Sequence, residues 1–152
     1  MHTSPRTSRQ ALFLIAGLFT FILIGLSSPA FSQNKGEKTF AVVITDSQGV
    51  ETEMRNVHFY WEEKVSETAF VPHELKHVPV KRGSATVNVK FDGIKTIEVK
   101  SPGEKGLPLI VISLASGNSG EFTLAIPGSF KGLSDFGETE LPATAIRKIV
   151  FK

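Results

Sequence analysis

An H-E-x-x-H motif contains the residues of this sequence that are best suited to chemistry. It consists of His73, Glu74 and His77 within the stretch "VPHELKHVPV" at 71–80. On a helix, residues four apart share a face, so both histidines would reach a single zinc ion. Glu74 would then act as the base that deprotonates a metal-bound water. The reaction would be the metal-assisted hydrolysis of a substrate bond.

The sequence around the motif gives little support for such a helix. Pro72 suits the first position of a helix, but Pro79 disfavours helical geometry at Val78, so about one and a half turns remain. No histidine follows His77, and no downstream glutamate lies on a recognisable second helix. The resemblance to zinc proteases is therefore confined to these five residues. We predict a solvated, partly helical loop here. A zinc-dependent hydrolase is the alternative hypothesis, and zinc is its only cofactor.

A second candidate is the aromatic cluster Phe59, Tyr60 and Trp61. Neighbouring residues of a strand face opposite ways, so at least one of Phe59 and Tyr60 should lie in the core. Exposed aromatic residues often mark recognition surfaces, so Tyr60 and Trp61 are the candidate binding residues. The adjacent Glu62 and Glu63 would also face opposite ways, which prevents them from flanking one glycosidic bond.

Residues 1–32 have the parts of a secretory signal peptide. Arg6 and Arg9 form a basic beginning without acidic residues, and residues 11–26 are an uncharged apolar stretch. Ala30 and Ser32 are small residues at the positions that a signal peptidase reads, which predicts cleavage after Ser32. Since a membrane-spanning helix needs roughly 20 apolar residues, we predict cleavage and release. The protein would stay at the membrane only if this segment were retained as an anchor.

Charge and cysteine content limit the remaining classes. All 15 acidic residues and 15 of the 17 basic residues follow residue 32, so the processed chain is formally neutral. Neutrality gives no electrostatic basis for binding nucleic acid or anionic lipid. The chain has no cysteine, so its core must be stable without disulfides, which suits a bacterial periplasm. We expect a periplasmic or secreted protein.

From residue 38 onward, short alternating or apolar runs are separated by turn residues. This pattern predicts one all-β domain over 38–152 with about eight strands, after a short linker at 33–37. The expected architecture is a small antiparallel sandwich or a barrel-like roll, with a loop or short-helix insertion at about 62–82. The predicted strands are 39–46, 50–61, 84–91, 94–100, 107–115, 121–128 and 145–152.

Two pairs of stretches resemble each other. The stretch "FDGIKTIEV" at 91–99 matches "ATAIRKIVF" at 143–151, so Phe91 is aligned with Ala143. The stretch "VVITDSQG" at 42–49 matches "IVISLASG" at 110–117, so Val42 is aligned with Ile110. The two stretches of the second pair lie farther apart along the chain than those of the first pair. An internal duplication would therefore require an extra segment in the first copy, in the region of the insertion. A shared β-strand composition is the alternative explanation.

In the first pair of stretches, two isoleucines stand three residues apart. This spacing does not keep both side chains on one face of a flat strand. A bend or bulge near Lys95 and near Arg147 would direct both isoleucines inward. The isoleucine pairs are Ile94 with Ile97, and Ile146 with Ile149.

These observations favour an exported, non-catalytic β-domain. We predict a binding or structural module of the cell envelope that presents an extended β surface to a protein, a peptide or a glycan. A further possibility is an accessory subunit that adds a strand to a partner sheet, which needs an exposed edge. An insertion on a plain scaffold is where a specific function would be added.

Overall fold

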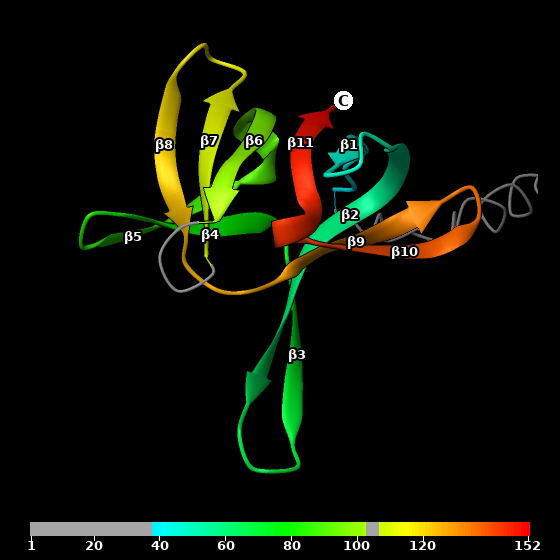
Figure 1. Ribbon diagram of the computed structural model, residues 1–152, viewed down its shortest axis with the longest axis vertical. Coiled ribbons are helices and arrows are strands. Elements are labelled where there is room, and N and C mark those ends of the chain that lie inside the picture. Colours follow the sequence, from blue (N-terminus) through cyan, green and yellow to red (C-terminus); the bar gives the residue numbers. More distant parts are fainter. Residues whose placement is uncertain (1–37, 103–106) are drawn as a thin grey trace, which may run out of the picture. The chain divides into compact units, whose positions relative to one another are not determined.

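The computed structural model describes residues 38–102 and 107–152, and this part of the chain is built mainly of β-strands (Figure 1). The all-β prediction is therefore confirmed. The predicted signal peptide at 1–32 and linker at 33–37 lie outside the described residues. Among the residues that are described, no helix is long and apolar enough to cross a membrane.

Eleven strands of the described residues form one antiparallel sheet that does not close on itself. Their order across the sheet is β10-β9-β2-β1-β11-β6-β7-β8-β4-β5, and β3 pairs with β2 outside this path. Two short 3-10 turns, η1 (Phe91–Gly93) and η3 (Ala143–Ala145), precede β6 and β11. The strands are β1 (Val42–Asp46), β2 (Glu51–Lys64), β3 (Phe70–Leu75), β4 (His77–Arg82), β5 (Ala85–Lys90), β6 (Ile94–Pro102), β7 (Pro108–Leu114), β8 (Ser119–Leu124), β9 (Ser129–Ser134), β10 (Gly137–Pro142) and β11 (Ile146–Phe151).

The strand count and the architecture differ from the prediction. The sequence pattern predicts about eight strands in a sandwich or barrel-like roll, whereas the described residues hold eleven strands in one open sheet. Strands β3 and β4 contain Pro72 and Pro79, and β9 and β10 contain Gly132 and Gly137. These residues interrupt the alternation by which strands are recognised. Long-range pairing compensates, since β9 pairs with β2 and β4 pairs with β8.

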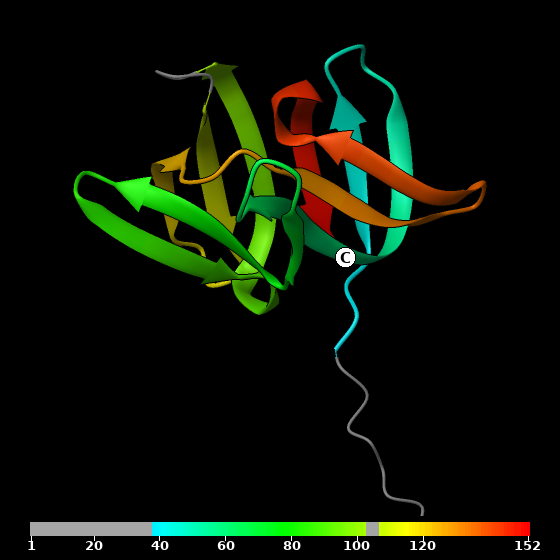
Figure 2. The same ribbon diagram turned by 90° about the horizontal axis from the view of Figure 1, so that it is seen from below.

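Corresponding strands follow one another in the same order on the two sides of the central pair of the sheet. The central strands β6 and β11 are antiparallel, with Ile97 opposite Ile149. From β11 the sheet continues through β1, β2, β9 and β10, and from β6 it continues through β7, β8, β4 and β5. Figure 2 shows these two groups of strands, which we call the β1 half and the β7 half.

Strand pairing reproduces both sequence alignments. Val42 of β1 pairs with Met54 of β2, and their aligned positions Ile110 of β7 and Phe122 of β8 pair in the same way. The alignment of Phe91 with Ala143 extends to whole elements, because β4, β5, η1 and β6 begin at the same relative spacing as β9, β10, η3 and β11. Strand β4 pairs with β8, and β9 pairs with β2. Each half therefore contains strands from the earlier part of the chain, β1 to β6, and from the later part, β7 to β11.

The bulges predicted near Lys95 and Arg147 are present. Each is the extra residue at a register shift, the first between β6 and β7 and the second between β11 and β1. All four isoleucines of the matched stretches consequently point into the core and are at most 4% exposed. The buried residues at matched positions are Ile94, Ile97, Ile146 and Ile149, together with Val42, Ile44, Ile110 and Ile112.

One hairpin of the β1 half has no counterpart in the β7 half. Strand β2 is 14 residues long and continues past its pairing with β1 to form a hairpin with β3, which projects from the other strands in Figure 1. The point where β2 leaves its pairing with β1 coincides with Asn56, whose φ is 50°, and with a register shift between β2 and β9. At the equivalent point β8 ends at Leu124, and residues 125–128 lead directly to β9. We call residues 57–76 the hairpin arm.

The prediction of a loop or short helix at about 62–82 was wrong. Apart from the turn at 65–69 and Lys76, these residues form the end of β2, all of β3 and all of β4. Pro72, which suited a helix start, is instead accommodated in β3, a strand that pairs only with β2 among the described strands. Proline is tolerated on such edge strands because no backbone donor is needed on the open side. The hairpin arm contains the extra segment that an internal duplication would require.

Candidate functional site

The H-E-x-x-H motif lies on two strands. His73 and Glu74 belong to β3, and His77 is the first residue of β4. In extended backbone, residues four apart are separated by up to roughly 13 Å, whereas a helix brings their Cβ atoms to about 5–6 Å. Adjacent residues of a strand also face opposite ways, so Glu74 does not share a face with His73. The helical arrangement that zinc proteases use is therefore not formed.

His73 instead belongs to a stack on one face of the hairpin arm. Its ring lies over the indole of Trp61, with centroids 4.5 Å apart and planes inclined by 12°. His73 Nε2 lies 2.9 Å from Glu63 Oε2. Trp61 Nε1 is buried and has no hydrogen-bond partner among the described residues. The same face continues inward to Phe59, which is fully buried and joins the arm to the core.

The opposite face of the arm is polar. Tyr60 donates a hydrogen bond of 2.6 Å to Glu62, and Lys131 Nζ lies 3.7 Å from the centre of the Tyr60 ring. The hydrogen bond to Glu62 is the largest cause that raises the pKa of Tyr60 to about 12, followed by desolvation and by nearby carboxylates. Glu74 also lies on this face, with Oε1 3.4 Å from His58 Nε2.

An open recess of about 380 Å³ lies at the base of the arm. Its walls come from β2, β9 and β10 and from the connection between β8 and β9. Tyr60 and Glu62 line it beside an ion pair of 3.6 Å between Lys131 and Glu140. Gly128 also lines it and has no room for a Cβ, which would lie 2.7 Å from the Tyr60 carbonyl oxygen. The recess therefore combines an aromatic ring with charges of both signs.

The far end of the arm exposes apolar side chains. Val65 and Phe70 are more than half exposed, and Val71 is 41% exposed. These residues flank the turn between β2 and β3, in which Ser66 Oγ accepts a hydrogen bond of 3.1 Å from the Ala69 amide. The arm contains four carboxylates and two lysines. It therefore presents an apolar tip on a hairpin with net negative charge.

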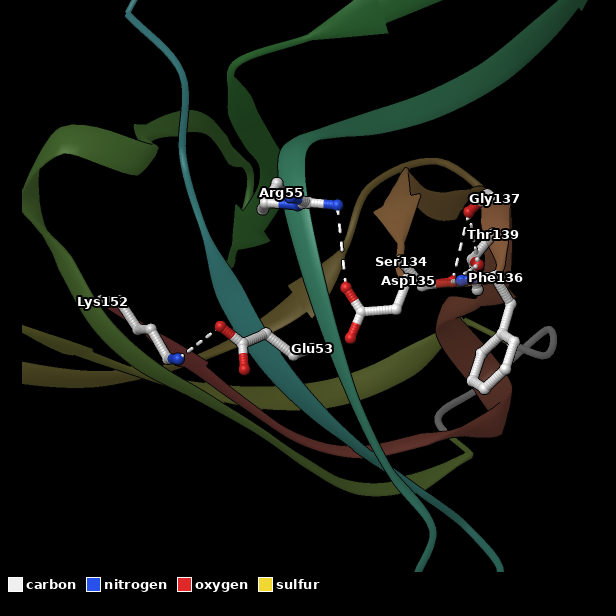
Figure 3. Close-up of polar contacts among 8 residues, drawn as sticks. All are labelled: Glu53, Arg55, Ser134, Asp135, Phe136, Gly137, Thr139 and Lys152. Atoms are coloured by element: carbon white, nitrogen blue, oxygen red, sulfur yellow. Dashed lines mark hydrogen bonds and ion pairs between the residues drawn. The ribbon is translucent and has the colours of Figure 1, made fainter.

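Another exposed aromatic residue is Phe136, in the turn between β9 and β10, whose side chain is fully exposed. Figure 3 shows the polar cluster that holds this turn. Thr139 donates a hydrogen bond of 2.8 Å to Ser134 Oγ, which also accepts one of 3.2 Å from the Phe136 amide. Arg55 Nη2 pairs with Asp135 at 3.8 Å. Phe136 therefore provides a matched comparison for the aromatic residue at the arm tip.

The structure separates the predicted site residues. Tyr60 and Trp61 are both in the arm but on opposite faces, while His77 lies on β4 opposite Lys90. Within residues 38–102 and 107–152, no three or more acidic or histidine side chains are grouped so as to hold a metal ion. Lys131 is not predictable from local sequence, because its place beside Tyr60 depends on the pairing of β9 with β2 and no local pattern marks it.

No known family model and no curated protein matches this sequence. The function is therefore inferred from the geometry of the described residues. The zinc-dependent hydrolase stays a prediction of the motif alone, since no contact of His73 or His77 with the described residues favours it.

Proposed function

We propose that this protein is an exported, non-catalytic module of the cell envelope that binds a partner protein through the hairpin arm. The proposal is carried by one observation: the arm is an addition to a scaffold whose strands otherwise recur in both halves. The scaffold does not require it at that point, since residues 125–128 connect the equivalent strands directly. A protruding element with an exposed apolar tip is suited to recognition.

Side chains of the arm are better suited to this contact than its backbone edge. Strand β3 pairs only with β2 among the described strands, so its other edge is open. Pro72 interrupts that strand and removes one backbone donor, which hinders the addition of a partner strand. Phe70 would instead enter an apolar pocket of the partner, since the adjacent Val71 faces the other side of β3, and basic residues around that pocket would complement the arm's carboxylates.

Internal duplication is the proposed origin of the scaffold. It is supported by the equal registers of β1 with β2 and of β7 with β8. It is also supported by the bulges at Lys95 and Arg147, which occupy aligned positions of the two matched stretches. Composition alone does not require equal registers and bulges. The arm would then be an insertion in the first copy.

Export is proposed from the apolar segment at 11–26 and from the small residues Ala30 and Ser32. The processed protein would begin at Gln33. N-terminal sequencing of the protein from periplasmic and membrane fractions tests this. A chain that begins at Gln33 in the soluble fraction would support the proposal, whereas an uncleaved chain in the membrane fraction would show that the segment is an anchor.

Photocrosslinking tests the binding role directly. A photoreactive phenylalanine analogue is placed at Phe70 in one variant and at Phe136 in the other, since both side chains are exposed, by 54% and 103%. We expect one reproducible envelope protein to crosslink at Phe70 and not at Phe136. Co-purification of that protein should be lost in Phe70→Asp and retained in Phe136→Asp. Equal crosslinking at both positions, or none at Phe70, would refute the proposed role of the arm.

A further inference from the structure

A cavity of about 320 Å³ lies in the β7 half, and none of its lining residues belongs to the hairpin arm. It is bounded by β5, β7 and β8 and by the end of β4. Ile112 is buried in the core, whereas Val87 on the edge strand β5 is 37% exposed. The volume falls at the lower end of the range of small-molecule sites, which is roughly 300–1,000 Å³. The apolar lining residues are Val87, Val89, Ile112, Leu114 and Phe122.

Arg82 is the one charged residue that lines this cavity. It ends β4 and is exposed. Among the described residues, the ion pairs involve other cations, and no carboxylate pairs with Arg82. Asn118 and Ser119 add polar groups to the same lining. The cavity therefore combines an apolar interior with a single positive charge.

Two equivalent positions of the β1 half are polar and hydrogen-bonded to each other. Since β4 corresponds to β9 and β5 corresponds to β10, Arg82 is aligned with Ser134 and Val87 is aligned with Thr139. Thr139 donates a hydrogen bond of 2.8 Å to Ser134, so these hydroxyl groups are already used within the protein. Both halves share the strand order, so the apolar Val87 and a cation that pairs with no carboxylate of the described residues are features of the β7 half and not of the fold.

We propose that this cavity binds a small carboxylate with an apolar body, of the chemical class of a medium-chain fatty acid. The carboxylate would accept hydrogen bonds from the Arg82 guanidinium, whose planar donors match a carboxylate in bidentate geometry. The alkyl chain would lie against Val89 and Phe122, which removes apolar surface of both molecules from water. A neutral ligand would leave the charge of Arg82 without a partner.

Calorimetric titration of the purified protein with decanoate below its micelle concentration tests the proposal, with decanol as the uncharged comparison. We expect saturable binding of one decanoate and weaker binding of decanol. Arg82→Gln should weaken decanoate binding by about 10-fold or more. Lys81→Gln is the matched control, because Lys81 is the neighbouring cation and does not line the cavity. That variant should leave the affinity unchanged.

A second variant and a mapping experiment separate loss of the site from loss of the fold. Val87→Glu places a carboxylate in the lining at a partly exposed position and should weaken binding without lowering the melting temperature. Decanoate should shift the amide resonances of Val89 and Gly120, and not those of their counterparts Leu141 and Thr52. No saturable binding, equal binding of decanol, or equal effects of Arg82→Gln and Lys81→Gln would overturn the proposal. These outcomes do not depend on the role of the arm.

Discussion

Gly128 packs against the two residues that lead the hairpin arm out of the core. A Cβ at this position would lie 2.7 Å from the Tyr60 carbonyl oxygen and would also collide with the Phe59 ring. Because the obstructing atoms include backbone, Gly128→Ala should lower the free energy of unfolding by about 1–3 kcal/mol. Urea denaturation measures this change. Gly93→Ala is the control, since no heavy atom lies within 4 Å of a Cβ there, and equal losses in both variants would contradict the explanation.

Tyr60 is the only tyrosine of the chain, so its titration is observed directly by tyrosinate absorbance. Its hydrogen bond to Glu62 is the main cause that raises its pKa from 10.0 to about 12. The unfolded chain loses the phenol proton near pH 10. The stability linked to this group is therefore fully present below pH 10 and is lost as the pH rises to about 12. Glu62→Gln should move the titration midpoint down toward 10.

Glu63→Gln is the control for this titration. Glu63 faces the other side of the arm, where it contacts His73, and it is not among the groups that shift the pKa of Tyr60. The midpoint should therefore stay near 12. An equal fall in Glu62→Gln and Glu63→Gln would mean that net charge, and not the hydrogen bond, raises the pKa.

Strand alternation at Phe59 and Tyr60 is the part of the candidate site that the sequence predicts well. It places one ring in the core and the other on the opposite face, as the structure shows. The contact of Tyr60 with Lys131 is not predictable in this way, because Lys131 is contributed by β9 and lies far along the chain. Local periodicity contains no information on which distant strand pairs with β2.

At the scale of the elements, the two histidines of the motif have different expected roles. His73 stacks on Trp61, the only tryptophan of the chain, while His77 lies on another strand. His73→Ala should shift the tryptophan fluorescence to longer wavelength and lower stability by about 0.5–1.5 kcal/mol through loss of the aromatic pair. His77→Ala should leave the emission unchanged. Both measurements are repeated with a metal chelator and with added zinc.

A zinc site would give a different pattern. Both variants would then lose the same zinc-dependent stability, and the chelator would reproduce the loss in the unsubstituted protein. The expected pattern is instead a change in His73→Ala alone that does not depend on zinc. This comparison tests the stacking role and the hydrolase alternative in one experiment.

Predictability also differs among the elements. The bulges at Lys95 and Arg147 followed from isoleucines three residues apart, because a flat strand cannot bury both. Strands β3 and β4 were missed because Pro72 and Pro79 are typical of loops, and tolerance of proline in a strand depends on which neighbour is present. Local sequence therefore reveals strand irregularities, but it does not reveal strands that are stabilised by distant partners.

At the scale of the whole described unit, the repeated strand order predicts that the sheet folds without most of the arm. Tyr60 pairs with Glu74 across the hairpin, so residues 61–73 are replaceable by an Asn-Gly turn that joins these two residues directly. This variant keeps Phe59 and Leu75, which pack in or against the core. We expect a lower melting temperature, through loss of the Trp61 contact, and a transition that remains cooperative.

The two proposed binding activities should separate in this shortened protein. Partner capture should be lost, because the arm tip is gone, whereas decanoate binding should persist, because the cavity of the β7 half has no residue in the arm. A matched variant replaces only residues 65–69 with the same turn, which then joins the paired Lys64 and Phe70. Because it keeps Trp61, its melting temperature should stay closer to that of the unsubstituted protein than the melting temperature of the variant without residues 61–73. If the shortened protein still captures the partner, the arm is not the recognition element. If it unfolds without cooperativity, the arm is part of the folding core and the two halves are not equivalent as scaffolds.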